Sequence, residues 1–212
     1  MNQWLNLLIG LALGMNLLAL ASGRLPSLIR SAAGQGVVLG ILPLLLGHQS
    51  WLTLGFAVCT MSVKGILIPA LLRRALRTSH MEREIRPIIG FIPSLLLGAA
   101  ATIASVGLAD TMPLRPEHAG SLLAAGAFAT LFTGFLLLIG RAKAIAQVCG
   151  YLILENGIFL FGLLLVGSTP LIVEAGILLD LTVAVFVIGI IMDRIQREFD
   201  TLDTRELTAL KE

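Results

Sequence analysis

Charged residues are scarce in this sequence, and their scarcity excludes most soluble folds. Asp, Glu, Lys and Arg make up 13% of the 212 residues, whereas hydrophobic residues make up 57% and the mean hydropathy is +0.94. A typical soluble domain is about 25% charged, so a water-soluble chain of this size would lack the polar surface to cover its core. Disordered chains are polar and poor in aliphatic residues, which excludes disorder as well. The remaining solvent is a lipid bilayer.

The motifs of redox and metal chemistry are also missing. The two cysteines, Cys59 and Cys149, both fall inside apolar runs and are not at CxxC spacing, so they predict neither a disulfide framework nor a zinc or iron–sulfur site. The sequence has no glycine-rich nucleotide loop and no HExxH motif. We therefore expect a chain that is not an enzyme on its own, binds no metal or other cofactor and has no nucleic-acid partner.

Long apolar stretches account for most of the chain. A membrane-spanning helix needs about 20 mostly apolar residues, and seven stretches meet this requirement. The predicted fold class is all-α: a polytopic membrane protein with a seven-helix transmembrane domain at residues 1–192 and a charged cytoplasmic tail at residues 193–212. The predicted spans lie near residues 4–21, 32–47, 51–72, 87–109, 120–140, 144–166 and 170–192.

The basic residues predict which way these helices cross the membrane. Thirteen of the fifteen Lys and Arg residues fall after the first, third and fifth spans or in the tail, and Arg115 alone falls on the opposite side. Because Lys and Arg concentrate on the cytoplasmic side, we expect the N-terminus outside and the C-terminus in the cytoplasm, in a multi-pass protein of the cytoplasmic (inner) membrane. The thirteen are Arg24, Arg30, Arg73, Arg74, Arg77, Arg83, Arg86, Arg141, Lys143, Arg194, Arg197, Arg205 and Lys211.

Four ionisable residues lie inside the predicted spans, where charges are costly and usually face protein or water. Glu155 and Asp180 are at the middle of the sixth and seventh spans, Lys64 is about two-thirds of the way through the third, and Glu174 is near the outer end of the seventh. We predict that they form a proton relay. Neighbouring polar and small residues, which favour close helix packing, are predicted to support it: Asn156, Gly157, Gly162 and Gly176.

Each of these residues also has a plainer interpretation. The long side chain of Lys64 could extend toward the basic cytoplasmic loop, and Glu174 could reach the membrane interface. Glu155 and Asp180 are too short for that, so their alternative is a static ion pair or hydrogen bond that holds helices together.

Three separated stretches resemble the hydrogenase-4 component E family. They are residues 141–162, residues 63–69 (VKGILIP) and residues 173–180 (VEAGILLD), and the resemblance continues into the tail at residues 199–207. The last three helices of that family, here residues 120–192, resemble the K subunit of respiratory complex I and the C subunit of Mrp-type antiporters. By this match Glu155 takes the place of the acidic residue in the K subunit's second helix. Either Glu174 or Asp180 corresponds to the acid of its third helix.

The resemblance implies an integral membrane subunit of a complex I-like group 4 NiFe hydrogenase or formate hydrogenlyase-type complex. Its expected partners are antiporter-like subunits, a quinone-site-like anchor subunit and a cytoplasmic hydrogenase module, and the NiFe and iron–sulfur centres are expected in those partner subunits. The buried acids would then contribute to proton translocation or to redox-to-proton coupling. Lys64 inherits no role from the K subunit.

Two other functions fit the same residues. One is a stand-alone proton-coupled secondary transporter that uses Lys64, Glu155 and Asp180 as its coupling site, although an odd number of spans suits paired repeats poorly. The other is a purely structural membrane anchor, in which Lys64 and Asp180 pair statically. A Gly-Arg pair follows both the first and the fifth span, at residues 23–24 and 140–141, and a parallel three-helix duplication is a further hypothesis.

Overall fold

Helices make up almost all of the part of the chain that the computed structural model describes, namely residues 2–46, 51–78, 84–85, 87–112 and 122–165. This confirms the all-α class, since these residues contain no strand beyond two isolated bridges, Arg24 with Glu84 and Pro87 with Arg141. The helices are α1 (Asn2–Ala21), α2 (Leu25–Gly40), α3 (Leu42–Leu46), α4 (Trp51–Ser62), the π-helix η1 (Val63–Leu67), α5 (Ile68–Thr78), α6 (Phe91–Asp110), α7 (Leu123–Gly140) and α8 (Ala144–Leu165).

Five of the described helical segments are long and apolar enough to cross a membrane. They are Gln3–Ala21, Leu25–Leu46, Phe91–Asp110, Leu123–Gly140 and Ala144–Leu164. They correspond to the first, second, fourth, fifth and sixth predicted spans. The third predicted span is the run α4–η1–α5, which the π-helix divides into pieces of 12, 5 and 11 residues. The seventh span, the tail, Glu174, Gly176 and Asp180 lie outside the described residues, so the count of seven stays a prediction.

Two predicted helix starts are wrong, and proline explains both. The second span was expected from residue 32, but α2 begins at Leu25, with Pro26 in its first turn, where the missing N–H costs little. The fourth span was expected from Pro87, but α6 begins at Phe91. Pro87 lies in an extended segment paired with Arg141, and Pro93 is the proline that occupies the first turn.

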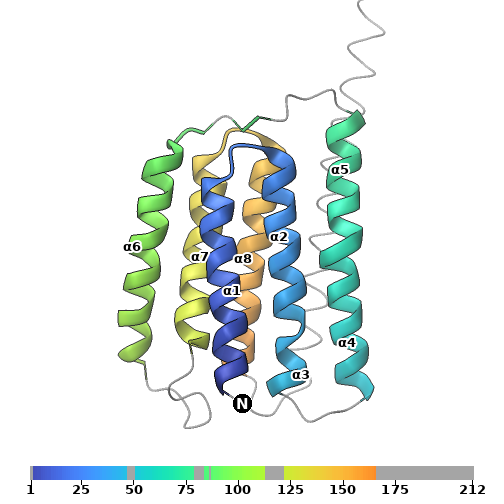
Figure 1. Cartoon of the computed structure of the whole chain (residues 1–212), viewed down its shortest axis with the longest axis vertical. Coiled ribbons are helices and arrows are strands. Elements are labelled where there is room, and N and C mark those ends of the chain that lie inside the picture. The colour runs from blue at the N-terminus through green and yellow to red at the C-terminus, as the bar shows by residue number, and fades with distance from the viewer. Residues whose placement is uncertain (1, 47–50, 79–83, 86, 113–121, 166–212) are drawn as a thin grey trace, which may run out of the picture.

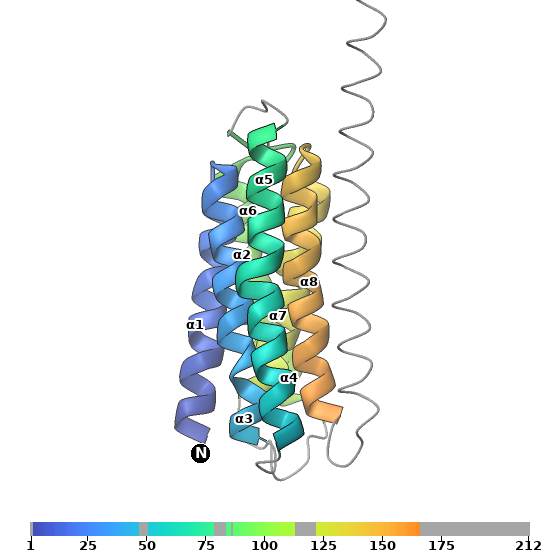
Figure 2. The ribbon, with the colours of Figure 1, turned by 90° about the vertical axis from the view of Figure 1, so that its right-hand side faces the viewer.

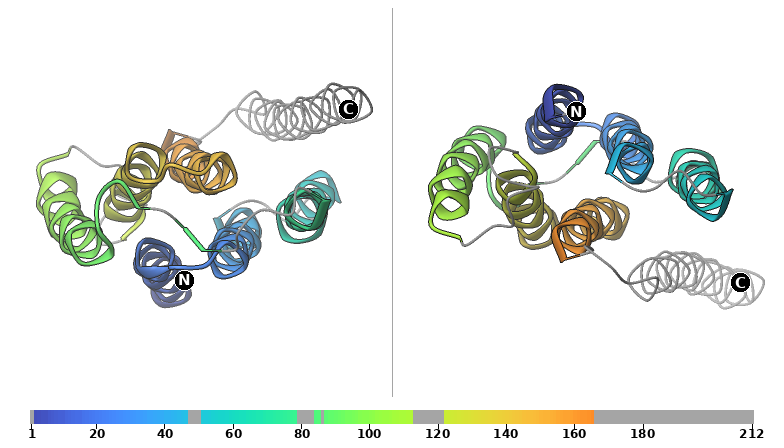
Figure 3. Two further views of the ribbon diagram at one scale, coloured as in Figure 1. Left: turned by 90° about the horizontal axis from the view of Figure 1, so that it is seen from above. Right: turned by 90° about the horizontal axis from the view of Figure 1, so that it is seen from below.

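The helices lie lengthwise beside one another as two facing hairpins with flanking helices (Figure 1). The α1–α2 hairpin packs against the α7–α8 hairpin, so that α1 contacts α7 and α2 contacts α8 (Figure 3). On one side α6 packs against α1 and α7, and on the other side α4, η1 and α5 pack against α2 (Figure 2). The two hairpins therefore form the centre of the bundle.

We call the end of the bundle that contains the two Gly-Arg turns the arginine end, and the opposite end the far end. Residues 84–85 and 87–90 lie at the arginine end and connect both turns by backbone hydrogen bonds. The N–H of Ile85 donates to the carbonyl of Gly23 at 2.9 Å, and the N–H of Ile88 donates to the carbonyl of Gly140 at 2.9 Å. The same short segment thus fixes the α1–α2 turn relative to the α7–α8 turn.

Glycines bring α7 and α8 into backbone contact. A Cβ atom on Gly134 would lie 2.5 Å from Cα of Leu154, and one on Gly157 would lie 2.7 Å from the backbone nitrogen of Leu131. Such distances leave no room for a side chain, which is how small residues let membrane helices approach closely. This contact fixes the position of α8 at the level of Glu155 and Asn156.

The two largest apolar clusters of the described residues lie in the interior, one toward each end of the bundle. The cluster at the arginine end includes Leu28, Ile29, Leu72 and Leu152. The far-end cluster includes Leu5, Ile9, Leu39, Leu123 and Leu160. A layer of buried polar side chains lies between them, and this layer is the candidate site.

Candidate functional site

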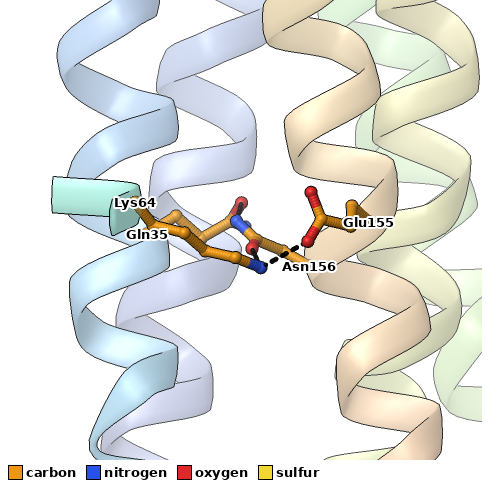
Figure 4. Close-up of polar contacts among 4 residues, drawn as sticks. All are labelled: Gln35, Lys64, Glu155 and Asn156. Atoms are coloured by element: carbon orange, nitrogen blue, oxygen red, sulfur yellow. Dashed lines mark hydrogen bonds and ion pairs between the residues drawn. The ribbon is translucent and has the colours of Figure 1, made fainter. Parts of the chain in front are cut away.

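Lys64 and Glu155 form an ion pair in the interior of the bundle (Figure 4). Nζ of Lys64 lies 2.8 Å from Oε1 of Glu155, and the two side chains are only 6% and 2% exposed. Burying a charge is costly unless it is paired with an opposite charge and hydrogen-bonded. Here Lys64 and Glu155 are each other's opposite charge. The structure therefore brings together two of the four residues predicted for the relay. It also contradicts the alternative in which Lys64 extends toward the basic loop.

The π-helix places Lys64 at this position. In η1 the N–H of Ile68 donates to the carbonyl of Val63, five residues earlier, which is the hydrogen-bond spacing of a π-helix. Short π segments inside α-helices are rare and occur frequently at functional sites. Lys64 is the second residue of this segment, and it is the one whose side chain is buried against α8.

Close contact between α2 and η1 then leaves the lysine little freedom. A Cβ atom on Gly36 would lie 2.7 Å from Cβ of Lys64, and one on Gly65 would lie 2.5 Å from Cγ2 of Val37. Both glycines are therefore needed for the two helices to approach this closely. The ring of Phe159 lies on the other side, with its centroid 5.6 Å from Nζ of Lys64, within the range of a cation–π contact.

A chain of side-chain hydrogen bonds extends from the lysine across the bundle. Nζ of Lys64 donates to Oδ1 of Asn156 at 3.0 Å, and Nδ2 of Asn156 donates to Oε1 of Gln35 at 3.1 Å. Nε2 of Gln35 donates to Oδ1 of Asn16 at 2.7 Å, and Nδ2 of Asn16 donates to Oγ1 of Thr130 at 2.9 Å. We call these three amides, Asn156, Gln35 and Asn16, the amide chain. Together with Lys64 and Thr130 it joins α1, α2, η1, α7 and α8.

All three amides of the chain point the same way. Each amide oxygen accepts from the side nearer Lys64, and each amide nitrogen donates to the side nearer Thr130. Dipoles in this order present their negative ends to the lysine and polarise one another, so they stabilise its ammonium form. An amide has no proton to release near neutral pH. The chain therefore holds Lys64 and its charge in place and is not itself a path for protons.

The polar layer contains residues that the sequence analysis did not identify. Asn16, Gln35 and Thr130 are buried, at 1%, 1% and 0% exposure, and none was predicted as a site residue. The signal was present, because Asn16 and Gln35 are amides within otherwise apolar spans. The predicted site, however, rests on ionisable groups and their neighbours in sequence.

The predicted supporting residues have different outcomes. Asn156 takes part directly, as the hydrogen-bond partner of Lys64. Gly157 allows the contact with α7 described above, and Gly162 lies further along α8 and is partly exposed. Lys64 pairs with Glu155 in the structure, and its pairing with Asp180 under the structural-anchor hypothesis stays a prediction, because Asp180 lies outside the described residues. Glu174, Asp180 and Gly176 stay predictions.

Arg141 is a second buried cation, at the arginine end. The sequence pattern predicts Arg141 as a basic residue of the loop after the fifth span, but its side chain is buried, with 0% exposure. Its Nη2 donates to the carbonyl of Leu20 at 2.7 Å and its Nη1 donates to that of Ile89 at 3.0 Å, and the guanidinium carbon lies 4.9 Å from the ring centroid of Phe91. Burial lowers the pKa of Arg141 from its ordinary value, yet arginine stays charged in proteins. It therefore joins the end of α1 to the segment that precedes α6.

The described residues offer no metal-binding cluster, since no three His, Cys, Asp or Glu side chains among them gather closely enough to hold an ion. Cys59 is exposed and Cys149 is buried, and both are free thiols. The chemistry of the polar layer is that of a lysine, a carboxylate and amides.

Comparison with known proteins finds relatives along most of the chain. The sequence is 32% identical over 195 residues to uncharacterized protein Rv0085 of Mycobacterium tuberculosis, which covers 89% of this chain and 87% of that protein. It is 31% identical over 150 residues to hydrogenase-4 component E of Escherichia coli K12, and this alignment covers 70% of this chain and 68% of that protein. The match to hydrogenase-4 component E of Shigella flexneri has the same identity and coverage. No family model and no solved structure matches the chain.

Proposed function

Because the chain belongs to the hydrogenase-4 component E family, we propose that it is a non-catalytic membrane subunit of a hydrogenase-type complex and that its Lys64–Glu155 pair couples electron transfer to proton translocation. The electron-transfer chemistry takes place in partner subunits that hold NiFe and iron–sulfur centres. This chain contributes the buried charges within the membrane. The observation that carries the proposal is the ion pair enclosed in the polar layer, 2.8 Å from nitrogen to oxygen.

The pair has the chemical properties that a relay needs. Glu155 is the group that accepts and releases a proton, and Lys64 is a neighbouring charge whose movement would change the proton affinity of that carboxylate. Intramembrane ionisable residues of this kind commonly mark proton pathways in pumps and transporters. Asp180 and Glu174 are proposed as further members of the relay because they lie within residues 120–192, the part of the chain that resembles the K subunit.

The arrangement of charge supports an orientation for this subunit. The described basic residues of the loops and of the end of α5, among them Arg24, Arg73 and Arg77, gather at the arginine end. By the positive-inside rule this is the cytoplasmic end. The N-terminus then lies on the outer side of the inner membrane and the C-terminus on its cytoplasmic side. The cytoplasmic hydrogenase module docks at this end, and antiporter-like subunits and a quinone-site-like anchor subunit lie beside the chain in the membrane.

A static membrane anchor is the second candidate, and the same ion pair favours it. Under that reading Lys64, Glu155 and the amide chain only hold five helical elements together. The two functions differ in what happens when both charges are removed at once. An apolar pair of similar volume keeps a buried contact stable, so it preserves an anchor but abolishes a relay.

The test compares the double variant Lys64→Met/Glu155→Leu with the native subunit in the assembled complex, in sealed native membrane vesicles. We expect normal assembly, normal hydrogen-linked electron transfer and a loss of proton translocation of about tenfold or more, because a group that transfers protons in the rate-determining step contributes about 100-fold or more to rate. The control is Glu84→Gln, which removes an exposed carboxylate at the arginine end. Unchanged translocation by an intact complex that carries the double variant would refute the relay and leave the anchor.

A further inference from the structure

A small cavity adjoins the ion pair on one side. It lies between α2, η1–α5 and α8, it has a volume of about 10 Å³, and Lys64 and Asn156 form part of its wall. A buried water molecule needs roughly 10–15 Å³ of such space and polar partners to bind it. The cavity therefore has about the size of a single water site, and in its otherwise apolar lining the two polar residues are Lys64 of the proposed relay and Asn156, the hydrogen-bond partner of Lys64.

The cavity extends from the polar layer toward the arginine end. On α2, which starts at the arginine end, it is lined by Ala32 and Ala33, ahead of Gln35 in the amide chain. On α5, which runs toward that end, it is lined by Leu72, beyond Lys64. On α8, which starts there, it is lined by Leu152, one turn before Asn156. All three elements therefore place it on the same side of the pair.

In two other directions away from the pair, the described residues are groups that do not carry protons. Toward the far end lies the apolar cluster with Leu39 and Leu160, both fully or almost fully buried. Across the bundle lies the amide chain, which has no titratable group. Within the described residues, the cavity is thus a feature next to Lys64 that has room for water.

We propose that this cavity is a water site through which protons reach the Lys64–Glu155 pair from the arginine end, an inference that rests on the proposed function. In the loading step, Lys64 first passes one of its protons to Oε1 of Glu155 and becomes a neutral amine, and the lone pair of this amine then accepts a proton from a hydronium ion in the cavity. The products are a water molecule, an unchanged lysine ammonium and a protonated glutamic acid, so protons and charge balance. Side chains of Ile29, Leu72 and Leu152 narrow the route and exclude bulk water.

Water access is measured first, without reference to transport. The cavity residue Ala32 is replaced by cysteine in a chain that also carries Cys59→Ser, and vesicles of defined orientation are exposed to Ag⁺, a thiol-reactive cation of about the size of water. The control is Ala129→Cys, a buried position on α7 that does not line the cavity. Since thiol reactivity follows access, we expect the Ala32→Cys thiol to be modified about tenfold faster than the control, and only when Ag⁺ is added on the arginine side.

The role in transport is measured second, by filling the cavity. Ala32→Val adds two methyl groups to its wall but leaves both charges in place, and we expect proton translocation to fall about tenfold with the complex intact. The matched variant Ala129→Val tests general overpacking, which destabilises a well-packed core but should not affect translocation by a complex that still assembles.

The two measurements separate this inference from the proposed function. Modification of the Ala32→Cys thiol that is no faster than the control, or that occurs equally from both sides, overturns the water site even if the pair proves essential. Normal translocation by intact Ala32→Val complex overturns the route. Loss of the relay itself is judged independently, by the Lys64→Met/Glu155→Leu variant.

Discussion

Removing one partner of the Lys64–Glu155 pair should destabilise the bundle strongly. In Lys64→Met the carboxylate of Glu155 stays buried without its ammonium, and breaking a buried pair in this way costs about 3–5 kcal/mol. The same change removes the donor to Oδ1 of Asn156, and a buried acceptor that loses its partner costs about 1–3 kcal/mol. These costs overlap because they share one ammonium group. We therefore expect a total near the upper end of the first range, about 4–5 kcal/mol.

Removing both partners should cost far less. In Lys64→Met/Glu155→Leu no charge is left among the described residues of the polar layer, and replacing a buried ion pair by apolar side chains of similar volume is often neutral or stabilising. The double variant still leaves Oδ1 of Asn156 without its donor, which costs about 1–3 kcal/mol. If each single change costs about 4 kcal/mol, the interaction energy of the two sites is therefore about 5 kcal/mol or more. Such strong coupling requires direct contact.

The measurement is reversible unfolding of the purified subunit in mixed detergent micelles, followed by circular dichroism, for the native chain, the two single variants and the double variant. Arg73→Met and Glu84→Leu, two exposed residues at the arginine end, provide a control cycle whose effects should be small and additive. The reasoning is refuted if Lys64→Met and Glu155→Leu each cost less than about 1 kcal/mol and their effects simply add.

Two further predictions concern the packing around this pair. Gly36→Ala should destabilise the subunit by about 1–2 kcal/mol, because its Cβ would lie 2.7 Å from Cβ of Lys64 and the overpacking cost of about 1–3 kcal/mol exceeds the gain in helix propensity. The control Gly10→Ala, whose Cβ would have nothing within 4 Å, should be neutral or stabilising. Equal changes in unfolding free energy for the two variants in detergent would contradict the close contact at Gly36. Arg141→Met should lower the free energy of unfolding by about 3 kcal/mol or more, since it removes two short charge-assisted hydrogen bonds worth about 1.5–3 kcal/mol each. The control Arg73→Met should have no measurable effect. A thermal midpoint for Arg141→Met within error of the native value would refute the role of Arg141 in joining α1 to the segment before α6.

The sequence predicted the parts of the fold that depend on local composition. Apolar runs of membrane-spanning length identified five segments that the structure forms as helices. Helix starts were less accurate, because Pro26 is compatible with a first helical turn whereas Pro87 lies in an extended segment, and proline alone does not distinguish the two. The π-helix at Lys64 was not predicted, since its sequence VKGIL contains no residue that rules out an ordinary α-helix.

Pairings between helices were harder to predict than the residues themselves. Lys64 and Glu155 were identified because a charge in an apolar span is conspicuous, but the partner of each depends on which helices are neighbours. That depends on contacts such as those of Gly36 with η1 and Gly157 with α7, which involve residues far apart in sequence. Asn16 and Gln35 are visible in the sequence as amides within apolar spans, but their connection to Lys64 depends on the same contacts between helices.

Arg141 illustrates the opposite error. Its position after an apolar span made it a loop charge, and the positive-inside rule counts such residues without regard to exposure. The structure gives it backbone carbonyls of Leu20 and Ile89 as partners, which no local pattern indicates. Its charge still lies at the arginine end, so the predicted orientation does not depend on whether it is exposed.

Stability alone is a weak reason for the polar layer. A buried ion pair is on average no better than well-packed apolar residues of the same volume, and interhelical hydrogen bonds in membranes contribute only about 0.6 kcal/mol each. An apolar layer between the two clusters would hold the five elements about as well. A property that apolar residues cannot supply is a change of charge. Lys64 and Glu155 have this property, and Lys64 lies in the wall of the cavity on the side of the arginine end. The variant that removes both charges while keeping the volume is therefore decisive, because it leaves the packing in place and removes only what a proton relay needs.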